Sequence, residues 1–381
     1  MAPMFALSRA AWRHRGRAWQ WRCAGAVALV LVLIAPLPTP FVLGAPVPVT
    51  TVNPKIGVHT RLTDEVEPRK ILQTLRLVHD MGVPWIVEFF PWPYYEPVKG
   101  QFDWAGADFI VDAARAEGLE VVARLGAVPD WARPKPEELE TNWNYLAEEH
   151  FPDYADFVGA FVTHFKGRVH YVILWNEPNL TREWGFRPVD PEGYVHLLSL
   201  AYPRAKAADP EVQVLAGALA PTLEPEGSQW GLNDLLFLER LYAAGFADYY
   251  DILAVHSYGL ALPADDPPAP ERINYRRAEL ARESMVRHGE SDKPIMITET
   301  GWNDQPRWIH GVRPAQRVAY TLAAYRMAQE QWPWCRMTAM WAFKYPAPFH
   351  NYMDNYAFVS ADLVPRVIYE EVRDYSQGVA R

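Results

Sequence analysis

Cysteine is scarce in this sequence of 381 residues, which contains only Cys23 and Cys335. Because Cys23 lies in a separate N-terminal segment, we expect no structural disulfide and no metal site built from thiolates. The sequence also lacks an H-E-x-x-H motif, a glycine-rich phosphate loop and a G-x-S-x-G motif. It therefore carries none of the common short signatures of zinc proteases, nucleotide-binding proteins or serine hydrolases.

An excess of positive charge is missing as well. The 46 acidic residues outnumber the 37 lysines and arginines, which gives a net charge of -9. An acidic chain is poorly suited to phosphate backbones, so we expect no nucleic-acid partner. Apolar residues make up 50% of the chain and charged residues 22%, which permits a substantial core. The 16 Trp and 19 Tyr are core residues or the walls of a sugar-binding groove, since aromatic faces stack on pyranose rings.

The N-terminal segment predicts export. Residues 9–22 are rich in arginine without any acid, and residues 23–49 that follow are largely apolar. This order is typical of a signal peptide, and it leaves the basic residues in the cytoplasm. A run of about 20 apolar residues can also span a bilayer. We therefore expect residues 1–50 to be a signal peptide or a membrane anchor, and residues 51–381 to work outside the cytoplasm, in the periplasm, in the medium or anchored to the cell membrane.

From residue 54 onwards, short apolar runs alternate eight times with amphipathic stretches. The runs predict strands at residues 55–59, 84–89, 119–126, 169–177, 212–219, 251–258, 294–300 and 337–343. The stretches predict helices at residues 68–81, 105–117, 152–166, 191–208, 233–244, 271–288, 314–331 and 364–375. Continuous apolar runs are typical of parallel strands that are covered on both faces. The pattern predicts an α/β protein with one (β/α)8 TIM barrel. The alternative is an open doubly wound sheet, but the sequence lacks the nucleotide-type loop that this fold would need.

Active sites of such barrels lie at the carboxyl ends of the strands. The predicted ends carry Glu88, Arg124, Asn176, Glu177, His256, Tyr258, Glu299, Trp341 and Lys344. Glu177 and Glu299 form a pair of the kind that glycosidic bond cleavage needs. One carboxyl group protonates the leaving oxygen while the other attacks or activates water. The alternative for either glutamate alone is an ion pair at a strand end, with Arg124 or Lys344 as the partner.

Asn176 and Glu177 are neighbours, and strict strand alternation would send them to opposite faces. If both serve the site, the strand must be irregular at Asn176. Pro178 disfavours helical geometry in the residue before it, so we expect Glu177 to stay extended at the strand end.

Four stretches carry a resemblance to a known group of enzymes. "WNEPN" (Trp175–Asn179) and "ITETGW" (Ile297–Trp302) resemble the signatures of the clan A retaining glycoside hydrolases. "FPWPYYEPVKGQFDW" (residues 90–104) and "PDW" (residues 129–131) are similar to the β-xylosidase-like family 39 and the cellulase-like family 5 of that clan. The resemblance covers nearly all of the chain from about residue 54. It implies a retaining O-glycoside hydrolase that cleaves β-linked glycosides or polysaccharides through a covalent glycosyl-enzyme.

The resemblance also implies roles for individual residues. Glu177 would be the general acid/base and Glu299 the nucleophile, while Asn176 would hydrogen-bond the 2-hydroxyl of the sugar. Glu299 must be ionised to attack, and its negative charge helps Glu177 to keep a proton until the glycosyl-enzyme forms. Glycosylation of Glu299 removes that charge and lets Glu177 activate water.

Further substrate-binding residues follow from the same resemblance. His256 and Tyr258 would frame the nucleophile, with the tyrosine hydroxyl near the Glu299 carboxylate, and Trp341 would lie under the sugar at the cleavage point. Arg124 and Trp131 complete the predicted binding set. As a group, the tryptophans in or near the predicted loops resemble subsite walls, although each of them can equally be a core residue: Trp92, Trp131, Trp184, Trp302 and Trp308.

One position departs from the pattern. Related sequences often have an arginine at the end of the second strand that helps to hold the nucleophile, where this chain has Glu88. We expect Arg124 on the third strand to form an ion pair with Glu88, and the alternative is that Glu88 binds a sugar hydroxyl.

Two other functions remain open from the sequence. A transglycosidase would use the same intermediate and pass the sugar to an acceptor sugar, and a non-catalytic carbohydrate-binding barrel would use only the groove. The hydrolytic chemistry needs no metal and no organic cofactor, and its expected partner is an oligo- or polysaccharide. The sequence does not indicate the sugar, the linkage, endo or exo action, or the oligomeric state.

Overall fold

The computed structural model describes residues 43–379 except 136, 138 and 140. The chain divides into two compact units, Met1–Gly44 and Ala45–Arg381. The predicted signal peptide or anchor therefore lies almost entirely outside the described residues. Within the described ranges, no helix is both long enough and apolar enough to cross a membrane.

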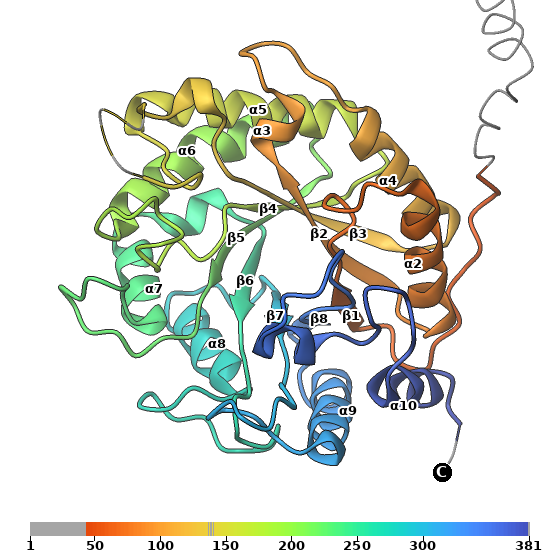
Figure 1. Ribbon diagram of the computed structural model, residues 1–381. Helices are drawn as coiled ribbons and strands as arrows, with labels where there is room; N and C mark the ends of the chain where they lie inside the picture. The colour runs from red at the N-terminus through yellow and green to blue at the C-terminus, as the bar shows by residue number, and fades with distance from the viewer. Residues whose placement is uncertain (1–42, 136, 138, 140, 380–381) are drawn as a thin grey trace, which may run out of the picture. The chain divides into compact units, whose positions relative to one another are not determined.

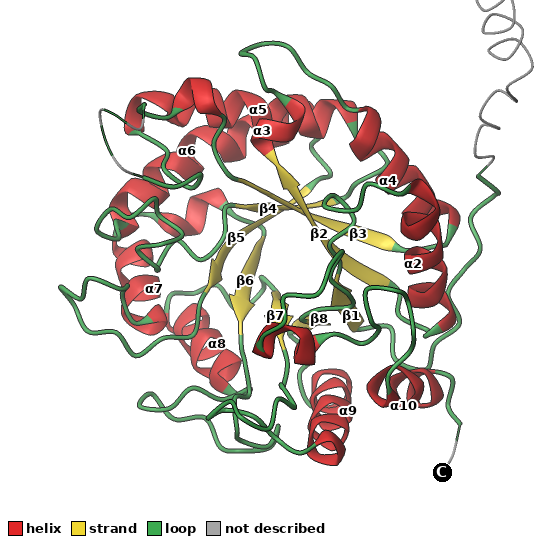
Figure 2. Cartoon of the chain, in the orientation of Figure 1, coloured by secondary structure: helices red, strands yellow, loops and turns green. Residues whose placement is uncertain are grey.

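The second unit is built on eight parallel strands that close into a barrel in chain order, from β1 to β8 and back to β1 (Figure 1). The strands are β1 (Ile56–His59), β2 (Trp85–Pro91), β3 (Glu120–Gly126), β4 (Tyr171–Leu174), β5 (Gln213–Leu219), β6 (Ile252–His256), β7 (Ile295–Thr300) and β8 (Cys335–Met340). Figure 2 shows that the strands form an inner ring and that the helices surround it. The predicted (β/α)8 barrel is confirmed.

The helices alternate with the strands, and a short extra helix follows β2. They are α2 (Pro68–Asp80), α3 (Trp92–Tyr95), α4 (Ala105–Ala116), α5 (Phe151–His164), α6 (Pro191–Ala208), α7 (Asp234–Ala243), α8 (Arg277–Arg287), α9 (Pro314–Glu330) and α10 (Val367–Ser376). Short 3-10 helices lie at Asp130–Ala132, Glu148–His150, Phe246–Tyr249 and Tyr352–Tyr356.

The strands are buried on both faces, which explains why their sequences are continuously apolar. Every residue of β1, β4 and β6 is buried. Side chains from β2 to β8 form one apolar cluster, which contains Val87, Val122, Tyr171, Ile173, Leu215, Ala218, Ile252, Ala254, Met296, Met337 and Ala339. The burial of this cluster holds the strands at fixed positions, and their carboxyl ends therefore form a rigid rim.

The end of β4 is irregular, and the backbone conformation of Glu177 differs from the predicted one. β4 stops at Leu174, and Trp175 and Glu177 have positive φ angles of 74° and 42°. The predicted irregularity is thus present on both sides of Asn176, whereas the expectation that Glu177 stays extended is wrong. The amide of Glu177 donates to the carbonyl of Ala218 in β5 (3.1 Å), which overrides the local preference imposed by the following proline. Positive φ in residues other than glycine is unfavourable and is concentrated at functional sites.

Two buried tyrosines fix this end of β4 from the outer helices. The hydroxyl of Tyr154 in α5 donates to the carbonyl of Leu125 in β3 (2.9 Å) and accepts from the amide of Trp175 (3.2 Å). The hydroxyl of Tyr194 in α6 bridges β4 and β5 in the same manner, at 2.7 and 3.0 Å. The two neighbours of β4 are therefore tied to it just where the regular ladder stops.

Candidate active site

A cavity of about 710 Å³ lies at the carboxyl ends of the strands. Six of the residues predicted for the site line it, namely Arg124, Asn176, Glu177, Tyr258, Glu299 and Trp341. They come from β3, β7 and the segments that follow β4, β6 and β8, so residues far apart in the sequence share one cavity.

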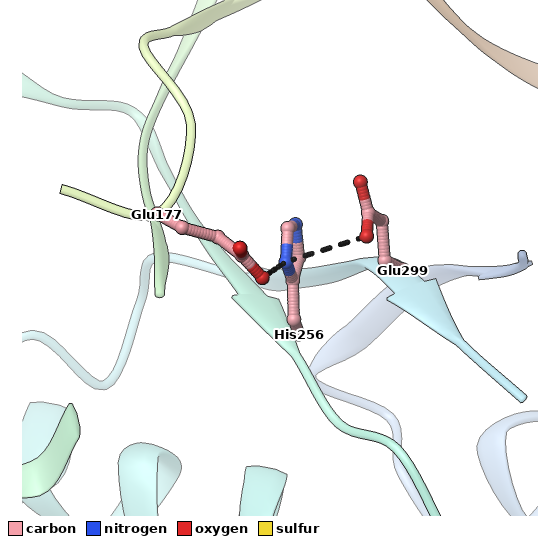
Figure 3. A group of neighbouring side chains, drawn as sticks. All are labelled: Glu177, His256 and Glu299. Carbon is pink, nitrogen blue, oxygen red and sulfur yellow. Dashed lines mark hydrogen bonds and ion pairs between the residues drawn. The ribbon is translucent and has the colours of Figure 1, made fainter. Parts of the chain in front are cut away.

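The two glutamates face each other across a histidine. In Figure 3 the ring of His256 lies between the carboxylates of Glu177 and Glu299. His256 Nδ1 donates to Glu177 Oε1 (2.7 Å) and lies 3.6 Å from Glu299 Oε2. One oxygen of each carboxylate and one nitrogen of the ring all lie within 4.8 Å of one another. Three such groups could also ligate a metal ion, but the hydrogen bond to Glu177 already satisfies Nδ1.

The histidine is beneath the cavity rather than on its wall. His256 is only 3% exposed and is absent from the residues that line the cavity. Burial lowers the pKa of this imidazole, but the charge of Glu299 and the hydrogen bond with Glu177 outweigh it, so that the pKa is raised above 6.5. His256 therefore contacts the carboxylates and does not face a substrate directly.

Glu299 is held by donors on both of its oxygens. Arg124 Nη1 donates to Oε1 (2.7 Å), and the hydroxyl of Tyr258 donates to Oε2 (2.9 Å). Burial and the charge of Glu299 raise the pKa of Tyr258 well above its usual value, so this hydroxyl keeps its proton. Both oxygens of the Glu299 carboxylate are therefore fixed in position by hydrogen-bond donors.

The expected ion pair between Arg124 and Glu88 is wrong. Arg124 Nη1 contacts Asn176 Oδ1 (2.8 Å) as well as Glu299, and Glu88 is satisfied elsewhere. Glu88 is fully buried and accepts hydrogen bonds from the hydroxyl of Thr60 (2.6 Å) and the amide of Thr63 (2.9 Å). Because the loop after β1 supplies these donors, Glu88 needs no cation, and its burial also excludes direct contact with a sugar. Burial raises the pKa of Glu88.

The aromatic residues divide between the cavity and the core. Trp308 lines the cavity, whereas Trp92, Trp184 and Trp302 are at most 1% exposed. Trp131, predicted as a binding residue, does not line the cavity either. Its Nε1 donates to the carbonyl of Glu96 (3.0 Å), and its ring packs edge-on against Trp92 at 5.3 Å. Its contacts are those of a packing residue.

Several cavity residues were not identified from the sequence. They are Arg61, Phe89, Asn142, Trp143, Asn144, Arg182, Glu183, Phe186, Tyr352, Met353 and Tyr356, among others. Most belong to loops without a motif, and only Glu183 carried a signal, since it is an acid in the same loop as Glu177. Lys344, a candidate partner for the glutamates, instead pairs with Glu65 (2.8 Å).

Comparisons with known proteins find similarities in sequence and in fold. A family model described as beta-galactosidase, of glycoside hydrolase family 42, matches residues 63–150. Among solved structures, a family 39 glycoside hydrolase from Bacteroides cellulosilyticus WH2 has a TM-score of 0.67 and 22% identity, over 85% of this chain and 64% of that one. This chain thus spans less than two thirds of that enzyme.

Two further structures are similar. A family 39 beta-xylosidase from Caulobacter crescentus has a TM-score of 0.59 and 18% identity, over 87% of this chain and 72% of that one. A beta-galactosidase from the psychrophilic Marinomonas ef1 has a TM-score of 0.59 and 12% identity, over 85% and 59% of the two chains. The chain has the clan A glycoside hydrolase fold. Within this fold, Glu177 and Glu299 stand at the ends of β4 and β7, the positions that the sequence resemblance assigns to the catalytic pair.

Proposed function

We propose that the protein is a retaining β-glycoside hydrolase. The observation that carries the proposal is that Glu177 and Glu299 line one cavity, with one oxygen of each carboxylate within 4.8 Å of the other. Carboxyl groups about 5–5.5 Å apart are typical of retaining enzymes, whereas inverting enzymes need about 6.5–9.5 Å to admit a water molecule between them and the sugar. The short separation supports a covalent intermediate.

In the first step, Glu299 attacks the anomeric carbon. The bond from this carbon to the leaving oxygen breaks, its electron pair stays on that oxygen, and Glu177 gives the oxygen a proton. In the second step, Glu177 takes a proton from water, the water oxygen bonds to the anomeric carbon, and Glu299 leaves as a carboxylate. Both proton transfers use the same side chain, and no metal or organic cofactor enters.

The neighbouring groups suit this division of labour. Arg124 and Tyr258 hold Glu299 with two charge-assisted hydrogen bonds, so that its carboxylate is fixed in position before the attack. Asn176 lines the cavity, and its Nδ2 would donate to the 2-hydroxyl of the sugar. Trp341, which also lines the cavity, offers an aromatic surface for the ring of the sugar.

The names of similar proteins suggest which sugars to try first. The matching family model is described as beta-galactosidase, and one similar structure is a beta-xylosidase. We therefore propose β-galactosides and β-xylosides as the leading substrates. Transfer to an acceptor sugar in place of water would give a transglycosidase with the same intermediate.

The test is hydrolysis of a panel of aryl β-glycosides by the purified full-length protein. We expect activity on at least one sugar, with a first product of the same anomeric configuration as the substrate when it is followed by NMR. Glu299→Gln should lower kcat by roughly a thousandfold or more, because it removes the nucleophile. Glu148→Gln, a change of a side chain that is 73% exposed, should have no effect.

Three results would contradict the proposal in different ways. Unchanged activity in Glu299→Gln would remove the role of Glu299, and a first product of inverted configuration would remove the covalent intermediate. Sugar binding without turnover on any glycoside would support a carbohydrate-binding barrel instead.

We also propose that the protein acts outside the cytoplasm, because a basic stretch at residues 9–22 precedes an apolar one at residues 23–49. Cell fractionation tests this, and recovery of the protein only from the cytosol would contradict it.

A further inference from the structure

A third carboxyl group lies in the cavity and takes no part in the proposed reaction. Glu183, in the segment after β4, lines the cavity together with Asn144 and Asn176. Its Oε2 accepts hydrogen bonds from Asn144 Nδ2 (3.0 Å) and from Asn176 Nδ2 (3.4 Å). Its other oxygen, Oε1, makes no hydrogen bond to any residue that the structure describes. Glu183 therefore has accepting capacity that the protein itself leaves unused.

The amide of Asn176 is oriented from both of its ends. Its Oδ1 accepts from Arg124 Nη1 (2.8 Å), while its Nδ2 points to Glu183. A flipped amide would place Nδ2 against a guanidinium and Oδ1 against a carboxylate, so only one orientation is favourable. Each amide nitrogen has two hydrogens, and one of them is free for a ligand after the bond to Glu183.

A sugar hydroxyl that accepts from Asn176 Nδ2 still has its own hydrogen to donate. Glu183 is an acceptor within reach of such a hydroxyl, because its Oε2 lies only 3.4 Å from that same nitrogen. Resting on the proposed function, we propose that Glu183 is a substrate-binding residue that accepts a hydrogen bond from a glycone hydroxyl, at C2 or C3, beside Asn176. The substrates would then be β-glycosides in which this hydroxyl is free.

The electrostatic surroundings are consistent with this role. Burial and the charge of Glu177 raise the pKa of Glu183, while the charge of Arg124 acts in the opposite direction. The charged form of Glu183 is therefore penalised by its surroundings in the protein. A hydrogen bond donated by a sugar hydroxyl favours the charged form and offsets part of that penalty.

The experiment combines a change in the enzyme with a change in the substrate. We would measure kcat/KM for the wild type and for Glu183→Gln and Glu183→Ala, each with the preferred aryl β-glycoside and with its 2-deoxy and 3-deoxy analogues. On the parent substrate we expect Glu183→Ala to lose roughly 10- to 100-fold, the range for a hydrogen bond to a charged group. On one of the two deoxy analogues, kcat/KM of Glu183→Ala should be within about threefold of the wild-type value, because the hydroxyl that Glu183 would contact is already missing. Glu183→Gln keeps the shape of the side chain and should give an intermediate loss.

An equal loss on all three substrates would overturn the proposal, since Glu183 would then act only by positioning Asn176. No loss on the parent substrate would also overturn it. Glu226→Gln, a change of a side chain that is 81% exposed and lies outside the cavity lining, is the matched control.

A binding version of the same experiment separates this proposal from the proposed function. The affinities of the parent and deoxy glycosides for Glu299→Gln, with and without Glu183→Ala, are measured by calorimetry. If the wild type hydrolyses no glycoside, the proposed function fails. The contact with Glu183 would still be supported if Glu183→Ala lowered the affinity for the parent glycoside but not for one of the two deoxy analogues. Equal affinities in all combinations would overturn the contact itself.

Discussion

At the scale of single residues, His256 is the group whose charge depends most directly on the catalytic pair. Its ring nitrogen lies against Glu177 and Glu299, and the ring is almost fully buried. Burial and, to a smaller extent, the charge of Arg124 oppose protonation of the ring, but the two carboxylates outweigh them and raise the pKa. The imidazolium form is thus stabilised by folding.

This gives the stability of the protein a defined dependence on pH. Because the folded-state pKa of His256 is raised above 6.5, the stabilisation is fully present below that pH and is lost as the pH rises through the folded-state pKa. His256→Phe should therefore lower the free energy of unfolding most at about pH 6 and progressively less towards about pH 9. Urea unfolding at a series of pH values measures this. His170→Phe, at a half-exposed histidine paired with Glu120, is the control and should show little effect; a pH-independent loss in His256→Phe would refute the argument.

Residues at the ends of the apolar strands could be placed at the rim from the sequence, and the positions of residues in the loops could not be predicted. Glu177 and Glu299 follow apolar strands, so their place at the rim follows from the strand pattern alone. The predicted ion pair between Glu88 and Arg124 was wrong because Glu88 accepts hydrogen bonds from the loop at residues 60–63. These hydrogen bonds cannot be predicted from the strand positions. Trp131 lies in a loop whose packing against Trp92 depends on long-range contacts.

At the scale of elements, the end of β4 depends on helices that lie outside the barrel. Tyr154 of α5 and Tyr194 of α6 place their hydroxyl groups between β4 and its two neighbours. The segment that carries Asn176 and Glu177 begins directly after these bonds. Its unusual backbone angles are therefore maintained by contacts on both sides.

Removal of either hydroxyl should weaken both folding and activity. We expect Tyr154→Phe and Tyr194→Phe each to cost about 1–2 kcal/mol of the free energy of unfolding, since buried backbone groups lose a partner. Each should also lower kcat on the preferred glycoside, because the segment after Leu174 is less firmly held. Denaturant unfolding and steady-state kinetics give the two values.

Tyr325→Phe provides the matched comparison. Its hydroxyl in α9 donates to the carbonyl of Gly57 in β1 (2.9 Å), a similar bond at a distance from β4. We expect Tyr325→Phe to lower the free energy of unfolding by a similar amount and to leave kcat unchanged. Equal losses of kcat in all three variants would mean that the bonds at β4 have no special role.

The predicted strands and helices agree with the structure to within a few residues in most cases, because their apolar periodicity is set by burial. The largest differences have local causes. β4 ends three residues before Glu177 because Trp175 turns to a positive φ, and α8 begins at Arg277 and not at residue 271.

At the scale of the whole molecule, the barrel closes between β8 and β1, and a buried ion pair lies beside this seam. Lys344 Nζ, after β8, contacts Glu65 Oε2 in the loop after β1 at 2.8 Å, with side chains that are 1% and 4% exposed. Burial acts to raise the pKa of Glu65, but the hydrogen bond from Lys344 lowers it below the usual value. The pair connects the first and last units of the barrel.

Loss of one partner should be costly. We expect Lys344→Met to lower the free energy of unfolding by about 3–5 kcal/mol near neutral pH, because it leaves Glu65 buried without its cation. Since the folded-state pKa of Glu65 is lowered, this difference is present above 4.5 and is lost as the pH falls through the folded-state pKa. Urea unfolding of the wild type and the variant across this range is the measurement.

Two controls define the origin of the loss. The double variant with Met at both positions should recover most of the stability, since no charge remains buried. Arg204→Met, in an exposed pair with Asp156, should cost at most about 1 kcal/mol. A loss in the double variant as large as in Lys344→Met would show that packing, and not charge, is responsible.

The eightfold alternation was predictable at this scale because every unit repeats the same burial pattern. The shape of the cavity was not, since its walls come from loops of unequal length that share no repeat. Asn142, Trp143 and Asn144 reach the cavity from the long connection after β3, and Tyr352 and Tyr356 reach it from the connection after β8.

The position of Arg124 affects how this group of proteins is best compared. The sequences that this chain resembles often have this arginine at the end of the second strand, whereas here the guanidinium reaches Glu299 from the third strand. A comparison by sequence position alone would record only that Glu88 replaces an arginine, although Arg124 places a guanidinium beside Glu299. The carboxyl ends of adjacent strands in a closed barrel lie close together. A guanidinium on either of two adjacent strands can therefore reach the same carboxylate. Such active sites are therefore better compared by the positions of their charged groups in space than by the residue type at each aligned position.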